Sequence, residues 1–421
     1  MDAEATRLHV NSGSSLTAGY GLPSGPVPLE PYRSPAFFAA ERERIFRRAW
    51  LVVGRVEEVP EAGSFILRQV DPCDVSALVT RSKAGHIQAF HNSCSHRGSA
   101  IVSAPAGRQG RFVCPYHKWT YGEDGRLLGV SDEADFPGLD KAKCGLKPIA
   151  TEVWEGWIFI NLGQPPEVDL ATFLGPFRDH LAGLSWLGCD GPVTFSAELE
   201  ANWKVVSDAF IESYHLLAIH PQSLAPAFAS DANPYGRFLS ARRLGPHQAV
   251  SYPGNAGYVL NPANRVEALA AGVAETGSVI AVASREAAAG FLSHPAVNPT
   301  RSNTWSMDTN ALFPNIHIDT GPGGIWTHQF WPLAPHRTRY EGRFYMAAAT
   351  SMRERFQQEA YIARLGEIVL EDLANVARTQ AGINSGGQAE MQLKDSEVGI
   401  RHALTQVIRW TEAASVAEAL A

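Results

Sequence analysis

Short apolar runs separated by turn residues characterise the first part of the chain, after an opening segment rich in Gly, Ser and Pro. Runs rich in β-branched and aromatic side chains favour strands, and they occur at residues 50–53, 64–67, 75–80, 87–90 and 154–161. Residues 35–48 instead space their apolar side chains as a helix does. We therefore expect a flexible arm over residues 1–34 and a β domain with a leading helix over residues 35–165.

The pattern becomes mixed after the Gly-Gln-Pro-Pro segment that begins at residue 163. Helical spacing covers residues 202–219, 352–379 and 398–410, and strand-like runs occur at residues 194–199, 303–307, 316–318, 325–332 and 339–348. Residues 225–300 are rich in Ala, Gly and Pro and predict little. The whole pattern predicts an α+β protein with a second domain over residues 166–421, on which the leading helix at 35–48 could pack.

Composition narrows the class of protein. The 421 residues are 45% hydrophobic and 19% charged, with a formal net charge of −7, as in a soluble globular protein of two or three domains. The lack of a basic stripe argues against nucleic-acid binding, and no apolar run approaches the roughly 20 residues that span a bilayer. The N-terminus shows no signal-peptide pattern, and the five cysteines are scattered, so we expect a cytoplasmic protein.

Two short motifs give the strongest chemical signal. Cys94 and His96 form a C-x-H motif, and Cys114 and His117 form a C-x-x-H motif after an intervening loop. Two thiolates can hold one iron of a [2Fe–2S] cluster and two imidazoles the other, which raises the reduction potential of the cluster. Zinc also accepts Cys and His, but zinc-finger spacings usually pair Cys with Cys and His with His. We therefore expect an iron–sulfur centre in loops that follow strands.

A second group of ligands lies in the predicted helix at residues 202–219. Asp208, Glu212 and His215 are spaced to share one helical face. His220 follows next to Pro221, which ends the helix and lets His220 turn back toward His215. Two imidazoles and one carboxylate make the facial triad of non-haem Fe(II) oxygenases, which leaves iron positions open for O₂ and substrate.

The carboxylate is expected from the long helix at residues 352–379. Asp372 lies on the apolar stripe of this helix, where an unpaired carboxylate would be costly and a metal would compensate it. Glu371 is the competitor, but it shares a face with Glu367 and Asn375 and is expected to be solvated. We therefore favour Asp372 as the third iron ligand.

These two constellations resemble the α subunits of Rieske non-haem iron oxygenases, also called aromatic ring-hydroxylating oxygenases. The resemblance covers residues 35–410 and rests on the two Cys/His motifs, Asn202-Trp203-Lys204, Glu212-x-x-His215-x4-His220-Pro221 and Glu371-Asp372. It implies a Rieske β domain followed by a helix-grip catalytic domain, in which helices cover an antiparallel sheet. It also implies a [2Fe–2S] cluster on Cys94, His96, Cys114 and His117, and mononuclear Fe(II) on His215, His220 and Asp372.

The resemblance further implies a homotrimer in which Glu212 bridges the two centres across a subunit boundary, so that electrons pass from His117 through Glu212 to the iron. It leaves open whether a small β subunit joins the trimer. The family often has Asn where this chain has Asp208. That residue is thought to lie close to the iron, so Asp208 is a second candidate catalytic residue with an altered role.

The expected function is that of a terminal oxygenase, which uses O₂ and supplied electrons to hydroxylate an aromatic or other apolar substrate. The alternatives are a monooxygenase that performs N- or O-demethylation or steroid-type hydroxylation, and a non-catalytic electron carrier, which the chain length disfavours. The chain lacks a dinucleotide-binding fingerprint, so we expect a separate NAD(P)H-dependent flavin reductase, with or without a ferredoxin. Candidates for the substrate pocket are Trp305, Phe313, Asn315, His317 and Trp326.

Overall fold

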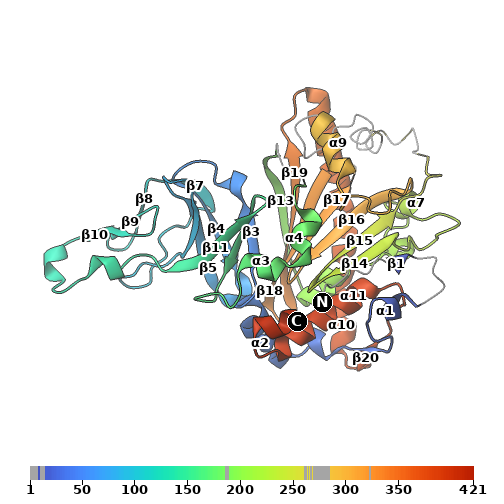
Figure 1. Ribbon diagram of the computed structural model, residues 1–421, viewed down its shortest axis with the longest axis horizontal. Coiled ribbons are helices and arrows are strands. Elements are labelled where there is room, and N and C mark those ends of the chain that lie inside the picture. The colour runs from blue at the N-terminus through green and yellow to red at the C-terminus, as the bar shows by residue number, and fades with distance from the viewer. Residues whose placement is uncertain are drawn as a thin grey trace. The chain divides into compact units, whose positions relative to one another are not determined.

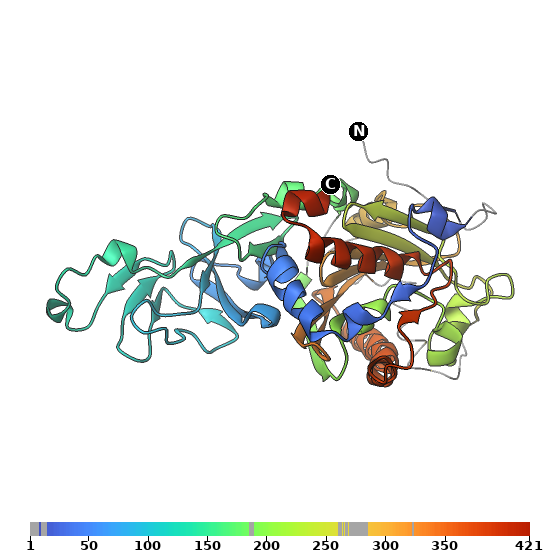
Figure 2. The ribbon, with the colours of Figure 1, turned by 90° about the horizontal axis from the view of Figure 1, so that it is seen from below.

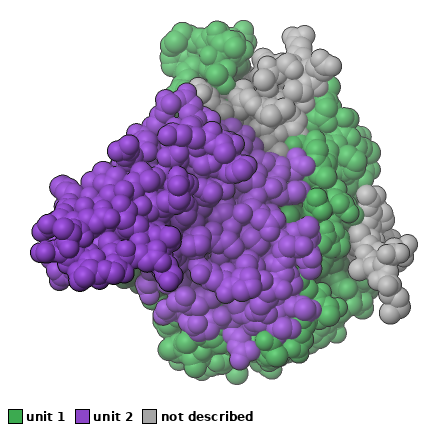
Figure 3. All heavy atoms as spheres, turned by 60° about the vertical axis from the view of Figure 1, so that its left-hand side comes forward, with its two compact units in different colours: residues 1–41, 174–414, 418–421 green, residues 42–173, 415–417 purple. Residues whose placement is uncertain are grey.

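The computed structural model describes residues 8–9, 15–184, 189–259, 263, 265, 268, 285–321 and 324–421. The chain divides into two compact units (Figure 3). We call residues 42–173 and 415–417 the small unit, and residues 1–41, 174–414 and 418–421 the large unit. The division falls inside the predicted leading helix, because its first part, α2 (Pro35–Glu41), belongs to the large unit and continues as a π-helix at Arg42–Phe46.

The small unit is built from antiparallel strands (Figure 1). One sheet has the order β3-β12-β11-β6-β5-β4-β7, formed by Leu51–Arg55, Trp157–Asn161, Pro148–Trp154, Ile87–His91, Val75–Arg81, Ser64–Val70 and Ala106–Arg108. A second sheet has the order β10-β9-β8, formed by Leu127–Gly129, Thr120–Gly122 and Arg111–Val113. The predicted run at 154–161 is a hairpin, because Glu155 and Gly156 have positive φ angles of 48° and 77° and reverse the chain.

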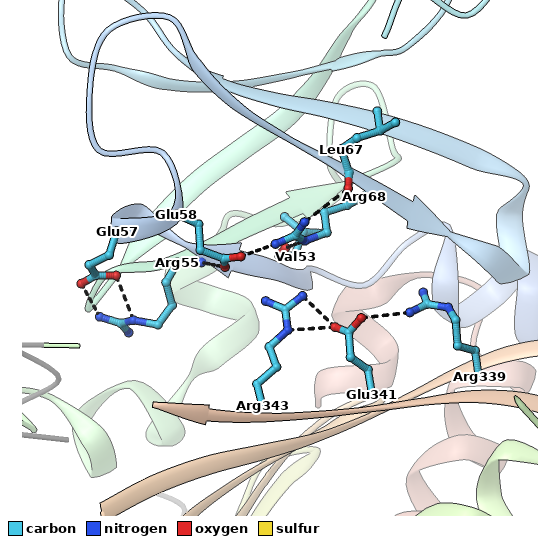
Figure 4. A network of polar contacts seen from close by, with 9 residues as sticks. All are labelled: Val53, Arg55, Glu57, Glu58, Leu67, Arg68, Arg339, Glu341 and Arg343. Atoms are coloured by element: carbon cyan, nitrogen blue, oxygen red, sulfur yellow. Dashed lines mark hydrogen bonds and ion pairs between the residues drawn. The ribbon is translucent and has the colours of Figure 1, made fainter. Parts of the chain in front are cut away.

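Ion pairs hold the connection between β3 and β4 in the small unit (Figure 4). The buried Arg55 guanidinium donates two hydrogen bonds to Glu57, at 2.8 and 3.0 Å. Glu58 accepts from the backbone N–H of Arg55 at 2.9 Å and pairs with Arg68. Bidentate and charge-assisted contacts of this kind are stronger than neutral hydrogen bonds, so they fix this turn beside the sheet.

The large unit contains an antiparallel sheet of eight strands in the order β1-β14-β15-β16-β17-β18-β19-β13. The strands are Leu8–His9, Ser240–Leu244, His247–Pro253, Trp305–Leu312, Ile316–Gly321, Gly324–Ala334, Arg337–Ala347 and Cys189–Leu199. The strands β14 and β15 fall in the segment 225–300, for which the sequence predicted little; residues 260–262, 264, 266–267 and 269–284 of that segment lie outside the described residues. On β19, Glu341 bridges Arg339 at 3.1 Å and Arg343 at 2.7 Å (Figure 4).

Helices pack on this sheet (Figures 1 and 2). The long helix α10 (Met352–Asn384) contacts β13, α5 and α6, and α11 (Val398–Glu412) contacts β15, α2 and α5. Ser351 caps α10 by accepting a hydrogen bond from the Glu354 N–H at 3.2 Å. The other α-helices of the described residues are α1 (Leu16–Gly19), α4 (Pro176–Leu181), α5 (Trp203–Asp208), α6 (Leu216–Ile219), α7 (Ala225–Phe228) and α9 (Arg285–Ser293) in the large unit, and α3 (Leu170–Leu174) and α12 (Val416–Leu420), which cross the division between the two units. Within the described part of the chain, every helix is too short or too polar to cross a bilayer.

The predicted helix at residues 202–219 is wrong as a single element, because the chain leaves the helical path after α5 and resumes it at α6. Phe210 stacks on the His328 ring at a centroid distance of 4.4 Å, whereas the buried Ile211 packs against Gly399 of α11. Two consecutive residues that are held by different elements pull the backbone out of a regular helix. The shared helical face that the sequence suggested for Asp208, Glu212 and His215 therefore does not form.

The flexible arm predicted over residues 1–34 is corrected for its second half. Residues 1–7 and 10–14 lie outside the described residues, but residues 15–34 pack onto the large unit. Tyr20 and Tyr32 are buried, and the Asp395 carboxylate accepts hydrogen bonds from the backbone N–H groups of Leu16 and Thr17 at 2.8 and 3.0 Å. Gly and Pro in this segment form turns between anchored apolar residues rather than a solvated tail.

Candidate metal centres and substrate cavity

The predicted cluster ligands lie in two loops of the small unit that have the same backbone pattern. In each loop the cysteine N–H donates to the carbonyl five residues later, Cys94 to Ser99 and Cys114 to Trp119, both at 2.9 Å. In each, the N–H of the residue four positions after the cysteine, Gly98 or Lys118, donates back to the cysteine carbonyl, at 2.8 and 3.0 Å. Gly98 and Lys118 both have positive φ, 77° and 61°. Two equivalent loops thus present one Cys and one His each.

The side chains of these loops converge. The His96 and His117 rings lie 4.6 Å apart between centroids, and His96 stacks on Trp119 at 5.0 Å. Both cysteines are buried in the core of the small unit, whereas both histidines are partly exposed. Two buried thiols beside two partly exposed imidazoles form a donor set that fits a [2Fe–2S] cluster, with its imidazole side nearer to solvent.

Hydrogen bonds prepare the sulfur atoms for this role. The Tyr121 hydroxyl lies 3.1 Å from the Cys94 Sγ and accepts from the Ser95 N–H at 3.0 Å. Burial opposes ionisation of Cys114, but backbone N–H groups of Tyr116 and His117 outweigh it and lower the pKa of this thiol. Metal-bound cysteine is a thiolate, so these contacts favour the form that binds iron.

The predicted iron ligands come together in the large unit. His215 precedes α6, His220 follows it, and Asp372 projects from the middle of α10. The Nε2 atoms of His215 and His220 lie 3.3 and 2.9 Å from the same oxygen, Asp372 Oδ1. One donor atom from each residue falls within 4.8 Å of the others, and Asp372 is 7% exposed. A buried carboxylate between two imidazole nitrogens is a donor set that fits a mononuclear iron.

A carboxylate also contacts the outer nitrogen of each histidine. Glu212 Oε1 pairs with His215 Nδ1, and Glu371 Oε2 lies 2.6 Å from His220 Nδ1. Histidines that bind a metal usually donate their other N–H group to a carboxylate, which fixes the ring and its tautomer. Burial opposes protonation of His215, yet hydrogen bonds to Asp372 and Glu212 raise its pKa to about 10. The site therefore concentrates negative charge, which a metal cation would balance.

One sequence expectation changes at this site. Glu371 is not a solvated residue, because it contacts both His220 and the Ser223 hydroxyl. The Oδ2 atom of Asp208 accepts a hydrogen bond from the Tyr32 hydroxyl at 2.7 Å, and the lining of the cavity beside the ligands does not include Asp208. The role of Glu371 was missed because helical periodicity reports the average exposure of a face and not contacts with a separate loop.

A cavity of about 330 Å³ opens beside the three ligands within the large unit. Its floor is one face of the sheet, and its walls include residues of α10, α6, α7 and the segment between α5 and α6. Its lining is largely aromatic and aliphatic and includes Phe210, Phe228, Tyr252, Met307, Trp326, Phe344, Tyr361 and Leu365. A concave, mainly apolar cavity with a few polar groups is the usual form of a small-molecule site.

Of the five residues predicted to line the pocket, the structure places Trp326 in the cavity lining. The other four predictions are corrected. Phe313 packs against Trp410 at 4.9 Å, and the Asn315 side chain donates to the Phe330 carbonyl at 3.1 Å. The His317 Nε2 atom lies 3.2 Å from the Ser207 hydroxyl. The cavity lining includes Ser306 and Met307 but not their neighbour Trp305. Alternation along a strand fixes the face of a residue but not its distance from the ligands.

Comparisons with known proteins agree with this architecture. Residues 192–413 match the family model described as the ring hydroxylating alpha subunit (catalytic domain), and residues 49–140 match the Rieske [2Fe-2S] domain. The oxygenase subunit of glycine betaine monooxygenase from Chromohalobacter salexigens is 36% identical over 224 residues, which are 52% of this chain and 49% of that protein. The matched part thus spans about half the length of this curated relative.

Two solved structures share the fold. Naphthalene 1,2-dioxygenase from Rhodococcus sp. aligns with a TM-score of 0.73 and 21% identity, over 93% of this chain and 95% of that one. A quaternary ammonium Rieske monooxygenase, reported with insights into carnitine oxidation by gut microbiota and inter-subunit electron transfer, aligns with a TM-score of 0.69 and 20% identity, over 92% and 95%.

The comparisons confirm the predicted fold class and the predicted cofactors. The fold is α+β with antiparallel sheets, and an N-terminal Rieske domain precedes a catalytic domain. The matched Rieske domain binds a [2Fe–2S] cluster, and the matched catalytic domain binds a mononuclear iron. The chain belongs to the family of ring-hydroxylating α subunits, the Rieske non-haem iron oxygenases.

Proposed function

We propose that this protein is the terminal oxygenase of a multicomponent Rieske system. Cys94, His96, Cys114 and His117 hold the cluster, and His215, His220 and Asp372 hold the iron. The observation that carries the proposal is the convergence of the two Nε2 atoms and Asp372 Oδ1 beside a mainly apolar cavity. A pure electron carrier would need neither this donor set nor the cavity.

When bound, the cluster supplies single electrons and the iron supplies O₂ activation, which belong to the cofactors and not to the chain. A monooxygenation consumes one O₂, two electrons and two protons. One oxygen atom enters a C–H bond of the substrate to give C–OH, and the other leaves as water. The electrons originate from NAD(P)H through a separate flavin reductase, with or without a ferredoxin. The cavity residues orient the substrate and exclude water.

Glu212 is the residue that we propose to connect the two centres. It pairs with His215 Nδ1 on one side and also lines a small surface pocket with Tyr214, Tyr235 and Lys394. The Lys394 ammonium lies 4.1 and 4.4 Å from the centroids of the two exposed tyrosine rings. Glu212 therefore reaches from the ligand sphere to the surface. We propose that the Rieske domain of a neighbouring subunit docks there, in a homotrimer with or without a small β subunit.

Variant E212Q tests this proposal. The variant should keep about three irons per chain, two of them in the cluster, and the visible spectrum of the cluster. Its turnover should fall by at least tenfold. The amide cannot take up a proton between the His215 imidazole and the cluster histidine of the neighbouring subunit. Glu367→Gln, an exposed substitution on α10, serves as the control. Turnover of E212Q at the wild-type rate would refute the bridging role, and two irons per wild-type chain would indicate a carrier.

Demethylation at nitrogen is a second candidate reaction. A buried carboxylate, Asp319, lines the otherwise mainly apolar cavity, and a purely aromatic substrate gives it no partner. The relative from Chromohalobacter salexigens is described as acting on glycine betaine, a quaternary ammonium compound. Hydroxylation of an aromatic or apolar substrate and demethylation use the same iron site, so the cavity decides between them.

A further inference from the structure

Asp319 is an unusual residue in the cavity floor. It lies on β17, is 2% exposed and lines the cavity that adjoins the iron ligands. Its Oδ2 atom lies 3.2 Å from His328 Nε2, which is the one ion-pair contact of Asp319 among the described residues. Its Oδ1 atom has no hydrogen-bond partner among the same residues. A buried carboxylate oxygen without a partner is costly, so a ligand group is the expected complement.

The contacts of His328 connect Asp319 to a second buried side chain. The Tyr340 hydroxyl, which is fully buried, lies 2.7 Å from His328 Nδ1. One neutral tautomer satisfies both contacts, with the Tyr340 O–H donating to Nδ1 and the Nε2–H donating to Asp319. Phe210 stacks on the same imidazole ring at 4.4 Å, which removes water from its face. His328 therefore accounts for Asp319 Oδ2 alone, and Oδ1 is left without a partner in the described part of the chain.

Aromatic residues lie beside this carboxylate. In the sheet register, Asp319 is paired with Trp326 on one side and Thr309 on the other, and Trp326 is paired with Phe344. All four side chains line the cavity, together with Tyr252. The Thr309 hydroxyl also lacks a hydrogen-bond partner in the described part of the chain. Aromatic faces attract cations, so the floor combines a carboxylate, a hydroxyl and π-surfaces.

We propose that Asp319 binds a cationic nitrogen of the substrate, and that the substrate class is small organic ammonium compounds. The inference rests on the proposed oxygenase function and narrows it to one kind of substrate. A neutral aromatic hydrocarbon leaves Asp319 Oδ1 and Thr309 Oγ1 unpaired. An ammonium group pairs with the carboxylate while its N-alkyl groups contact Trp326 and Phe344. Arg364, which also lines the cavity, donates to the Ser223 carbonyl at 3.2 Å.

Binding of three probes of nearly equal shape tests the proposal. Choline is a quaternary cation, 2-(dimethylamino)ethanol is a protonated amine at pH 7, and 3,3-dimethylbutan-1-ol is their neutral carbon analogue. Dissociation constants are measured by calorimetry on anaerobic protein with both metal centres loaded. We expect at least one cation to bind tenfold or more tightly than the neutral alcohol. Tighter binding of the protonated amine would assign Asp319 Oδ1 as the acceptor of its N–H.

Variant D319N should abolish the preference for cations, while the affinity for the neutral alcohol and the iron content remain at wild-type values. The matched control is D308N, because Asp308 is equally buried but pairs in register with Thr320, on the face away from the cavity. This control should keep the preference. If D319N does not fold, the comparison of the three probes on the wild-type protein decides the question.

Equal affinities of the wild-type protein for all three probes, or no cation binding at millimolar concentration, would overturn the proposal. So would a D319N variant that keeps the cation preference. These results are distinct from a failure of the oxygenase function, which would appear as missing iron or a missing cluster in the wild-type protein before any probe is added.

Discussion

The buried ion pair between Glu41 and Lys204 should be a large local determinant of stability in the large unit. The Lys204 Nζ atom lies 2.5 Å from Glu41 Oε1, and the two side chains are 4% and 0% exposed. Glu41 Oε2 also accepts from the Trp203 Nε1–H at 3.2 Å. Burial is the main influence on both groups, and it raises the pKa of Glu41 and lowers that of Lys204. The pair joins α2 to α5, the helix that leads into the iron-binding segment.

Removal of one partner leaves the other charge buried and unpaired, which costs about 3–5 kcal/mol. Variant E41Q keeps an acceptor for Trp203 but removes the charge, and K204M removes the opposite charge. A unit of roughly 290 residues has an unfolding entropy near 0.6 kcal/mol/K, so this cost lowers the unfolding midpoint by about 5–8 °C. The double variant E41Q/K204M should recover most of that loss, because it buries no unpaired charge.

Thermal unfolding at pH 7, followed by circular dichroism on protein with both metal centres loaded, measures these midpoints. Arg47→Gln, which removes an exposed pair with Glu43, is the control and should change the midpoint by less than about 2 °C. If E41Q changed the unfolding midpoint as little as the Arg47→Gln control does, the expected cost of the unpaired charge would be wrong. A double variant as unstable as the sum of the two single variants would show that the pair does not act as a unit.

Three further predictions concern the metal centres and their surroundings. Variant E371A should lower iron affinity by about 10–100-fold, because His220 loses the carboxylate on its outer nitrogen. Metal titration measures this affinity, and the control variant E367A should leave it unchanged. Variant Y121F should lower the reduction potential of the cluster, measured by spectroelectrochemistry, because the hydrogen bond to Cys94 stabilises the more negative reduced state; an unchanged potential would contradict it. Burial raises the pKa of Asp208 to about 7 from its ordinary 3.8, against the hydrogen bond from Tyr32. The native state thus retains a proton that the unfolded chain releases, so the free energy of unfolding should fall from about pH 4 to pH 7. Urea titrations of D208N should show a smaller decrease, and not its complete loss, because burial also raises the pKa of Asp308 to about 6.

Much of this protein is determined locally by its sequence. The strands of the small unit follow from short apolar runs between turn residues, and both cluster motifs lie in loops because each supplies its ligands within a few residues. The long helix α10 follows from helical spacing, and Asp372 on its apolar stripe is 7% exposed, as a residue of that face should be. These features depend on side-chain chemistry at short separation, which periodicity reports directly.

Only the tertiary structure decided how distant elements meet. Phe210 and Ile211 are held by a strand residue and by α11, so the helix that the sequence predicts is interrupted between α5 and α6. Glu371 reaches His220 because α10 packs beside α6. Asp319 becomes the polar centre of an aromatic cavity because strand register sets Trp326 beside it. Such contacts arise from packing between segments far apart in the chain, which local patterns do not encode.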